Sequence, residues 1–258
     1  MKILYFGDLI GKAGIRGLSL YLKKQIEEKK PDFIFINGEN LAGGKGITEE
    51  VFNEVKDLGV DGFSTGNHVF DKREVISLLR ETGEIIRPLN YPVGIPGKGY
   101  QVFKKNNLKV AVINLCGRVF MKPLDCPFKR VESAIKAIKE ETDIILVDFH
   151  AEATAEKQAL GHFLDGQVTG VFGTHTHTQT NDLQLLKKGT LYLTDLGMVG
   201  ANDSILGSKK DTIINHFLTG MPFRVEVEVF GSIRINGVEF DIDVDGSINS
   251  FQLINELI

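Results

Sequence analysis

The sequence predicts an α/β fold, either a four-layer αββα sandwich or another α/β arrangement whose second half is more antiparallel. Short, nearly all-apolar segments alternate with helical stretches through the first two-thirds of the 258 residues, which is typical of sheets covered on both faces. From about Leu183 the pattern changes to apolar pairs with the spacing of hairpins. No linker or repeat interrupts the chain, so we expect 1–258 to form a single domain whose C-terminal part, 183–258, is richer in β-hairpins.

The alternating elements can be placed in chain order. Apolar segments predict strands at Lys2–Phe6, Phe33–Ile36, Gly62–Ser64, Lys109–Leu115, Ile144–Asp148 and Val168–Phe172. Amphipathic stretches predict helices at Ile15–Lys29, Glu49–Leu58, Arg73–Arg80, Arg130–Glu140 and Ala153–Leu164. Thr48 is the expected N-cap of the second helix, because a threonine side chain can accept a hydrogen bond from the first turn.

Two hairpins are expected in the last part of the chain. Leu183–Leu186 would pair with Leu191–Leu193, and Phe223–Phe230 would pair with Gly231–Asp241 through a turn at Phe-Gly-Ser. These hairpins make a homo-oligomer plausible, although no residue pattern establishes one.

Composition limits the classes of partner and compartment. The net charge is −4 with both signs interspersed, so no basic stripe predicts binding to duplex nucleic acid. An anionic substrate would have to be held by local groups such as metals. Cys116 and Cys126 are the only cysteines and are expected to be reduced. The chain begins at once with a strand and has no apolar run long enough for a bilayer, so we expect a soluble, cytoplasmic protein without a membrane segment.

Five strand-to-loop junctions carry side chains suited to metal binding. They are Gly7-Asp8, Asn37-Gly38-Glu39-Asn40, Gly66-Asn67-His68, Asp148-Phe149-His150 and Gly173-Thr174-His175-Thr176-His177. In an α/β sheet, ligands bind beyond the carboxyl ends of the strands. Loops that are far apart in the sequence can therefore converge at that edge.

The histidine pair His175 and His177 is the most distinctive of these features. Neutral imidazole is the commonest protein ligand for transition metals, and residues at i and i+2 of an extended loop point both rings to the same side. The isolated histidines His162 and His216 are expected to be structural instead.

The ligand types indicate the metal. Carboxylates, amide oxygens and imidazoles without a thiolate suit Mn, Fe or Mg better than a structural zinc site. Two ions about 3.5–4 Å apart need a bridging carboxylate and about three further ligands each. The candidates are Asp8, Glu39, Asn40, Asn67, His150, His175 and His177. We expect two divalent or trivalent ions, iron or manganese first, with magnesium or zinc as alternatives.

These blocks resemble, in order, those of the calcineurin-like metallophosphoesterases, and more closely those of the YmdB-like subfamily. The matching stretches lie within about residues 1–210 and read Phe6-Gly-Asp-Leu-Ile-Gly, Asn37-Gly-Glu-Asn-Leu-Ala-Gly-Gly-Lys-Gly-Ile-Thr, Gly66-Asn-His-Val-Phe-Asp, Asp148-Phe-His-Ala-Glu-Ala-Thr and Gly173-Thr-His-Thr-His-Thr-Gln-Thr-Asn-Asp. The wider superfamily usually has His where this chain has Ile10 and Asp where it has Glu39. Both departures favour the subfamily.

The resemblance implies a metallophosphoesterase-type αββα sandwich with mixed sheets and a dinuclear metal centre. The implied ligands form two sets that share the bridging Glu39: Asp8, Asn40 and His177 at one ion, and Asn67, His150 and His175 at the other. It also implies phosphodiesterase action on small molecules, 2′,3′-cyclic nucleotides in the subfamily, by attack of a hydroxide that bridges the two ions.

His68 is implied to be the general acid that protonates the leaving group. An imidazole whose pKa lies close to neutrality suits this role, and Asp71 could orient its ring. The alternatives are a nucleotidase, phosphomonoesterase or nuclease that uses the same centre, and a regulatory nucleotide-binding protein with weak catalysis.

Two glycine-rich segments flank these blocks. Gly43-Gly44-Lys45-Gly46 lacks the spacing of a P-loop, so we favour a flexible loop at the rim of the active site, with a phosphate contact as the alternative. Asp195, Asp203 and Ser204 lie in or beside the segment Gly197–Gly207, which could form a wall of the cleft.

Overall fold

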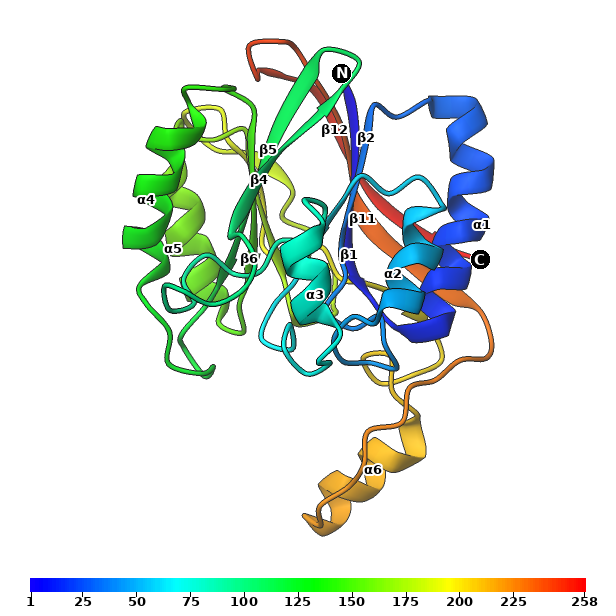
Figure 1. The fold of residues 1–258 in the computed structure, drawn as a ribbon. Helices are drawn as coiled ribbons and strands as arrows, with labels where there is room; N and C mark the ends of the chain where they lie inside the picture. Colours follow the sequence, from blue (N-terminus) through cyan, green and yellow to red (C-terminus); the bar gives the residue numbers. More distant parts are fainter.

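Two six-stranded sheets lie face to face, with helices on the outer face of each (Figure 1). The computed structural model describes residues 1–258, with the side chains of 26–29 left out. Each sheet contains both parallel and antiparallel pairs. The predicted four-layer αββα sandwich with mixed sheets is therefore confirmed.

The first sheet has the strand order β12-β11-β10-β1-β2-β3. Its strands are β1 (Lys2–Leu9), β2 (Phe33–Asn37), β3 (Gly62–Ser64), β10 (Met198–Ala201), β11 (Ile233–Ile242) and β12 (Ile248–Leu257). The helices α1 (Gly11–Lys29), α2 (Glu49–Lys56) and α3 (Val75–Glu81) pack on its outer face through one apolar cluster. In this sheet β1, β2, β3 and β10 run parallel, so their carboxyl ends meet at one edge.

The second sheet has the strand order β4-β5-β6-β7-β9-β8. Its strands are β4 (Tyr100–Lys105), β5 (Leu108–Cys116), β6 (Ile145–His150), β7 (Gly170–Thr174), β8 (Gln184–Leu185) and β9 (Leu191–Leu193). The helices α4 (Pro127–Ile138) and α5 (Thr154–Leu164) cover its outer face. The hairpin of β8 and β9 confirms the predicted pairing of 183–186 with 191–193.

Burial on both faces explains why the central strands read as continuous apolar runs. Along β1, Leu4 and Phe6 belong to the cluster under the helices, whereas Ile3 and Tyr5 belong to the cluster between the sheets. Successive side chains of a strand point to opposite faces, so every position of β1 needs an apolar residue. The Tyr5 ring lies 5.6 Å from that of Phe172 in the opposite sheet.

The predicted second hairpin is wrong. Residues 223–230 form no strand beyond an isolated bridge at Val227, and β11 pairs instead with β12 through a turn at 243–247. β11 also pairs with β1 and β10, so both of its edges are occupied. The prediction failed because it took the nearest apolar segment as the partner, whereas the tertiary fold places 221–230 outside the sheet.

A projecting arm replaces that hairpin. We define the arm as residues 203–230, which include α6 (Lys210–Thr219), a helix that the sequence pattern did not predict. The two limbs of the arm are joined where the Lys209 N–H donates to the Glu226 carbonyl at 2.8 Å. In Figure 1 the arm extends away from the sandwich, and α6 has no buried residue. The helix therefore does not pack on the core, although Ile213, Ile214, Phe217 and Leu218 recur at helical spacing in its sequence.

Most other element boundaries shift by a few residues. α1 begins at Gly11, and β7 ends at Thr174. Thr48 holds the N-cap position of α2 with an extended backbone, but its side chain makes no capping hydrogen bond. Neither β4 nor the short strand β10 was predicted. Among the described residues, no helix is both long enough and apolar enough to cross a membrane.

A buried carboxylate joins the two sheets beside their common edge. Asp148 on β6 accepts hydrogen bonds from Asn37 Nδ2 of β2 at 3.0 Å and from the Ser64 hydroxyl of β3. It also accepts one from Thr174 Oγ1 of β7 at 2.7 Å. These bonds tie the ends of four strands together, and the loops that follow these strands carry most of the candidate metal ligands.

A buried ion pair holds the loop that follows β7. Lys157 Nζ of α5 lies 2.6 Å from Asp195 Oδ2, and both side chains are almost fully buried. The same carboxylate oxygen accepts hydrogen bonds from the Thr176 N–H at 3.2 Å and the Thr176 hydroxyl at 2.7 Å. Asp195 therefore anchors the residue between His175 and His177.

We expect Lys157→Met to lower the free energy of unfolding by about 3 kcal/mol or more, because it leaves a buried carboxylate without its cation. Urea denaturation followed by circular dichroism measures this. Lys104→Met is the matched control: its partner Glu141 and Lys104 itself are both exposed, so the loss should stay below about 1 kcal/mol. Equal losses in the two variants would contradict the anchoring role.

Candidate metal centre

The seven predicted ligands all lie at the common edge of the two sheets. Asp8 is the penultimate residue of β1, Glu39 and Asn40 follow β2, and Asn67 follows β3. His150 ends β6, and His175 and His177 follow β7. Six of them form one network of contacts, described below, and Asn40 lines the cavity above it.

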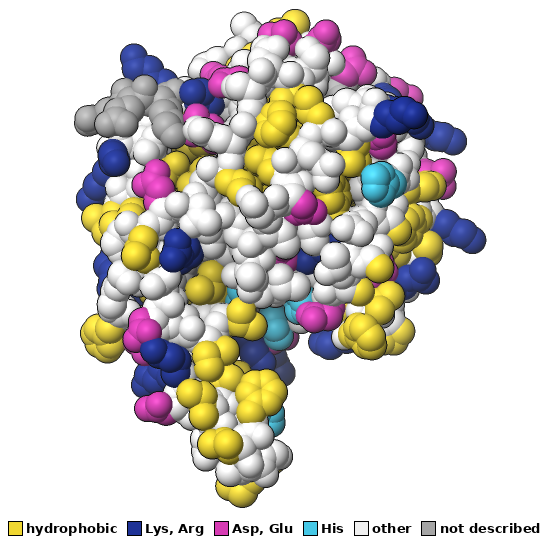
Figure 2. Space-filling model, turned by 180° about the vertical axis from the view of Figure 1, so that it is seen from behind, with side chains coloured by type: hydrophobic (Ala, Val, Ile, Leu, Met, Phe, Trp, Pro, Cys, Tyr) yellow, Lys and Arg dark blue, Asp and Glu magenta, His cyan; other side chains and the backbone are white. Residues whose placement is uncertain are grey.

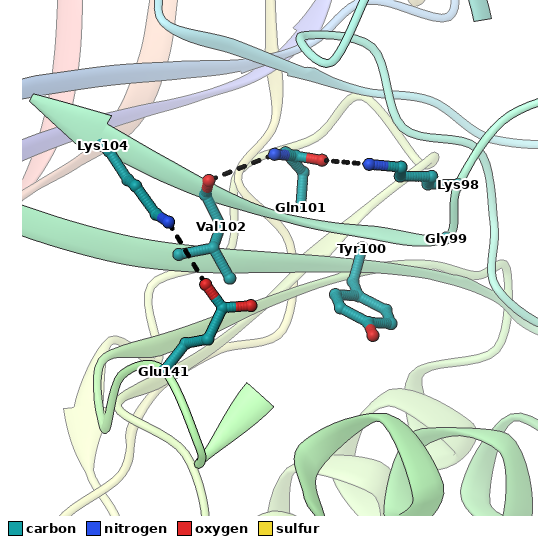
Figure 3. Close-up of a pocket in the computed structure, with 7 residues that line it drawn as sticks. All are labelled: Lys98, Gly99, Tyr100, Gln101, Val102, Lys104 and Glu141. Carbon is teal, nitrogen blue, oxygen red and sulfur yellow. Dashed lines mark hydrogen bonds and ion pairs between the residues drawn. The ribbon is translucent and has the colours of Figure 1, made fainter. Parts of the chain in front are cut away.

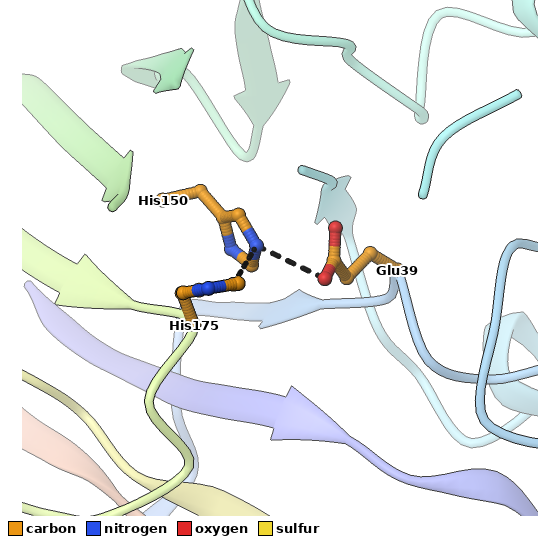
Figure 4. Close-up of side chains that lie close together, drawn as sticks. All are labelled: Glu39, His150 and His175. Carbon is orange, nitrogen blue, oxygen red and sulfur yellow. Dashed lines mark hydrogen bonds and ion pairs between the residues drawn. The ribbon is translucent and has the colours of Figure 1, made fainter. Parts of the chain in front are cut away.

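Three side chains converge most closely. Glu39 Oε1 lies 2.9 Å from His150 Nε2, and His175 Nδ1 lies 3.0 Å from the same nitrogen. Figure 4 shows the three side chains pointing toward one another from separate loops. Asn67 Oδ1 lies 3.2 Å from His150 Nε2 as well.

Hydrogen bonds on the far side of each ring decide which nitrogens are free to bind. Thr174 donates its hydroxyl proton to Asp148, so it accepts from His150 Nδ1–H at 3.0 Å. His175 Nε2 lies 3.1 Å from Glu152 Oε2, a carboxylate that can only accept. In the neutral rings, His150 Nε2 and His175 Nδ1 therefore carry lone pairs. These two nitrogen lone pairs, the Glu39 carboxylate oxygen and the Asn67 amide oxygen converge on one point. Together they form a set of donors suited to a cation.

The charges of these groups agree with that conclusion. Burial alone would raise the pKa of Glu39, but His150 beside it lowers that pKa to about 2. Burial would lower the pKa of His150, but the Glu39 carboxylate raises it to about 9. Burial next to His150 lowers the pKa of His175 to about 3. The cluster therefore requires one positive charge, which either a proton or a metal ion can supply, and metal binding releases the proton.

Two further candidate ligands have buried oxygens without a hydrogen-bond partner, namely Asp8 Oδ1 and Asn40 Oδ1. Asp8 uses its other oxygen to accept the His175 N–H at 3.0 Å, and burial raises its pKa to about 6. Asn40 Nδ2 donates to the Gly44 carbonyl at 2.9 Å, which fixes the orientation of the amide. Buried polar atoms are rarely left unsatisfied, so both oxygens fit the role of metal ligands.

His177 lies on the other side of Asp8. Its Nε2 is 3.9 Å from Asp8 Oδ1, and its Nδ1 is 3.0 Å from the Leu206 carbonyl, to which it donates. The expected extended loop is wrong, because His175 and His177 have φ angles of 100° and 62°. Left-handed backbone at non-glycine residues is uncommon and clusters at functional sites.

His68 lies at the edge of this cluster. Its backbone N–H donates to Glu39 Oε2 at 3.2 Å, and its Nδ1 lies 2.9 Å from Asp71 Oδ2. If Nδ1 donates to this carboxylate, Nε2 remains available to a bound ligand. The side chain lines the same cavity as the candidate ligands.

A cavity of about 590 Å³ opens above the cluster. Its lining includes Asn40, Lys45, His68, His175 and His177 from the sandwich, and Leu206, Ile213, His216, Phe217 and Phe223 from the arm. Figure 2 shows histidine side chains in the hollow between the sandwich and the arm. The position of Lys45 agrees with a rim loop at 43–46.

Sequence reasoning missed the arm side of the cavity. His216, which we expected to be structural, is half-buried and lines the cavity, whereas His162 is exposed on α5. The aromatic residues Phe217 and Phe223 close to His216 in the sequence were the signal that could have indicated a binding surface. Asp203 and Ser204 do not appear among the lining residues, whereas Asp195 acts from beneath as the anchor of Thr176.

Another hollow, of about 600 Å³, lies beside the edge strand β4. Figure 3 shows its lining, with an ion pair of 3.3 Å between Lys104 and Glu141. In the part of the chain whose side chains the structure describes, no histidine lines it, and Glu141 is the one carboxylate there. It therefore lacks the donor set found above the sheet edge.

Comparison with known proteins agrees with the blocks in the sequence. A family model described as "YmdB-like protein" matches residues 4–254. The chain belongs to this family. The 2′,3′-cyclic-nucleotide 2′-phosphodiesterase of Bacillus subtilis (strain 168) is 45% identical over 243 residues, which cover 94% of this chain and 92% of the relative.

Two solved structures resemble this YmdB-like chain over its whole length. A hypothetical protein from Thermus thermophilus has a TM-score of 0.93 at 38% identity and covers 100% of this chain and 99% of its own. A protein from Mycoplasma pneumoniae described as a novel phosphatase has a TM-score of 0.93 at 32% identity. The match covers 100% of this chain and 93% of that protein's chain.

We expect Gly66→Ala to weaken Mn²⁺ binding by about 10- to 100-fold, because the added methyl must displace two candidate ligands and disturbed ligand orientation has a cost of this size. A Cβ at this position would overlap Glu39 Oε2 and His150 Nε2. Titration calorimetry measures the affinity. In the control Gly83→Ala the nearest atoms lie 3.7 Å away, and binding should not change. Unaltered affinity in Gly66→Ala would contradict a metal site at Glu39 and His150.

Proposed function

We propose that this protein is a metal-dependent phosphodiesterase of the calcineurin-like metallophosphoesterase superfamily and that it hydrolyses 2′,3′-cyclic nucleotides. The observation that carries the proposal is the convergence of acceptor atoms from Glu39, His150 and His175 beneath the cavity. The 45% identical relative, itself named a phosphodiesterase for these substrates, supports the substrate class.

The donor atoms fit two ions that share Glu39. Asp8, Asn40 and His177 would hold one ion with Glu39, and Asn67, His150 and His175 would hold the other with it. Oxygen and imidazole donors without a thiolate suit iron or manganese. When bound, such a pair of ions supplies a nucleophile at neutral pH and neutralises charge on the phosphoryl oxygens.

The residues of the chain itself do the remaining work. His68 protonates the oxygen that leaves phosphorus, with Asp71 Oδ2 2.9 Å from its Nδ1 to hold the ring. Lys45 brings a positive charge to the rim of the cavity, where it attracts an anionic phosphodiester. The cavity of about 590 Å³ accommodates a nucleotide-sized molecule.

Complete removal of metal should abolish hydrolysis of 2′,3′-cyclic AMP, and Mn²⁺ or Fe²⁺ should restore it. Elemental analysis of the purified protein should give two ions per chain. Full activity of the metal-free protein would refute the proposal. Linear phosphodiesters and phosphomonoesters belong in the same assay, because a nuclease or a nucleotidase would use the same centre.

His68→Ala should lower kcat for 2′,3′-cyclic AMP by about 10²- to 10⁴-fold, the usual contribution of a general acid, while both ions stay bound. The matched control is His162→Ala, an exposed histidine on α5, which should leave kcat unchanged. Loss of metal from His68→Ala would show that this residue is a ligand and not the acid.

A further inference from the structure

The arm exposes large apolar side chains that no part of the core covers. α6 has no buried residue, and the exposed fractions of Phe217 and Leu218 are 81% and 79%. Figure 2 shows hydrophobic side chains spread over the arm. Apolar surface of this kind usually marks a binding site.

The apolar residues of the arm fall into two sets. Phe217, Phe223 and Val225 line the cavity above the metal centre, whereas Leu218 and Ile214 do not. The first set therefore borders the same cavity as His175 and His177, within reach of a ligand that extends from the centre toward the arm. The second set lies outside that cavity.

The rings of Phe217 and Phe223 lie close to that of His216, which lines the same cavity. The His216 and Phe223 ring centroids are 4.4 Å apart with an interplanar angle of 31°, and those of His216 and Phe217 are 5.6 Å apart. His216 Nδ1 donates to the Met221 carbonyl at 2.8 Å, which holds the ring in place. A neutral His216 thus keeps Nε2 as an acceptor.

The two ends of the arm that join the sandwich contact residues of the candidate metal centre and of its rim loop. The Leu206 carbonyl accepts a hydrogen bond from His177 Nδ1 at 3.0 Å. On the return limb, Val227 packs against Gly44 in the loop that carries Lys45, because a Cβ on Gly44 would lie 2.6 Å from a Val227 methyl. Both limbs of the arm are therefore fixed beside the candidate metal ligands.

We propose that His216, Phe217 and Phe223 form a site for the nucleobase of the substrate. The inference rests on the proposed function, which places the phosphate at the metal centre. A planar heterocycle stacks on aromatic rings, and every base offers a π face, so the site accepts purines and pyrimidines. An exocyclic amine of the base can donate to His216 Nε2.

A nucleobase fits this site better than a second protein chain does. The rings line a cavity of about 590 Å³, a volume suited to a small molecule. The cavity also holds one charged end, at Lys45 and the metal ligands, and one aromatic end on the arm. A nucleotide has the same division between phosphate and base.

The test compares Phe217→Ala with the wild type on two substrates, 2′,3′-cyclic AMP and glycerol 1,2-cyclic phosphate, which has the same cyclic diester without a base. For cyclic AMP, KM should rise about 5- to 150-fold, the usual effect of losing one stacking contact, with kcat nearly unchanged. For the glycerol diester, neither constant should change. Saturation-transfer NMR should also show that adenosine binds the wild type and not the variant.

Leu218→Ala is the matched control, since it removes an equally exposed apolar side chain from the next position of α6. It should leave both substrates unaffected. The nucleobase site is refuted if Phe217→Ala leaves KM for cyclic AMP unchanged, alters both substrates equally, or still binds adenosine. A wild type that cleaves neither cyclic diester would refute the proposed function instead, and adenosine binding would still decide the nucleobase site.

Discussion

The buried hydrogen bonds of Asp148 are the interaction on which the rest of the site depends. Four candidate ligands, Asp8, Glu39, Asn40 and Asn67, come from the strand ends and loops of the first sheet, and three histidines come from those of the second. The centre can therefore exist only if the two sheets keep a fixed relative position. Asp148 accepts hydrogen bonds from both sheets, and through Thr174 it sets the tautomer of His150. One carboxylate thus links the packing of the fold to the chemistry of the ligand.

Electrostatics explains why the edge of the sheets forms a cation site and not merely a polar patch. Asp8, Glu39 and His150 are almost fully buried, and Asp8 Oδ1 has no hydrogen-bond partner. Burying carboxylates without compensating charge costs several kcal/mol each. Lys157, the buried cation nearby, is engaged with Asp195. The missing positive charge can come from a protonated histidine or from a bound cation, and a cation would satisfy several of the converging acceptors at once.

The sequence predicted the sandwich and the ligand junctions because both follow from local pattern. Apolar strands buried on both faces and polar residues at their carboxyl ends are visible without tertiary information. The partner of β11 and the arm were not predictable in this way. β12 carries mostly exposed side chains, so its sequence leaves no clear alternation, and α6 lies in an arm that packs on no core. The left-handed backbone of His175 and His177 likewise depends on contacts made by distant residues.

That backbone shows how the arm and the metal centre depend on each other. Left-handed φ at a non-glycine residue costs on the order of 1–3 kcal/mol and persists only where surrounding contacts impose it. Asp195 holds Thr176 from below, and the Leu206 carbonyl of the arm binds His177 from the other side. Leu206 itself has a φ of 52°. The arm therefore helps to orient a candidate ligand as well as to wall the cavity, since the carbonyl that holds His177 belongs to the same segment as the rings that line the far side.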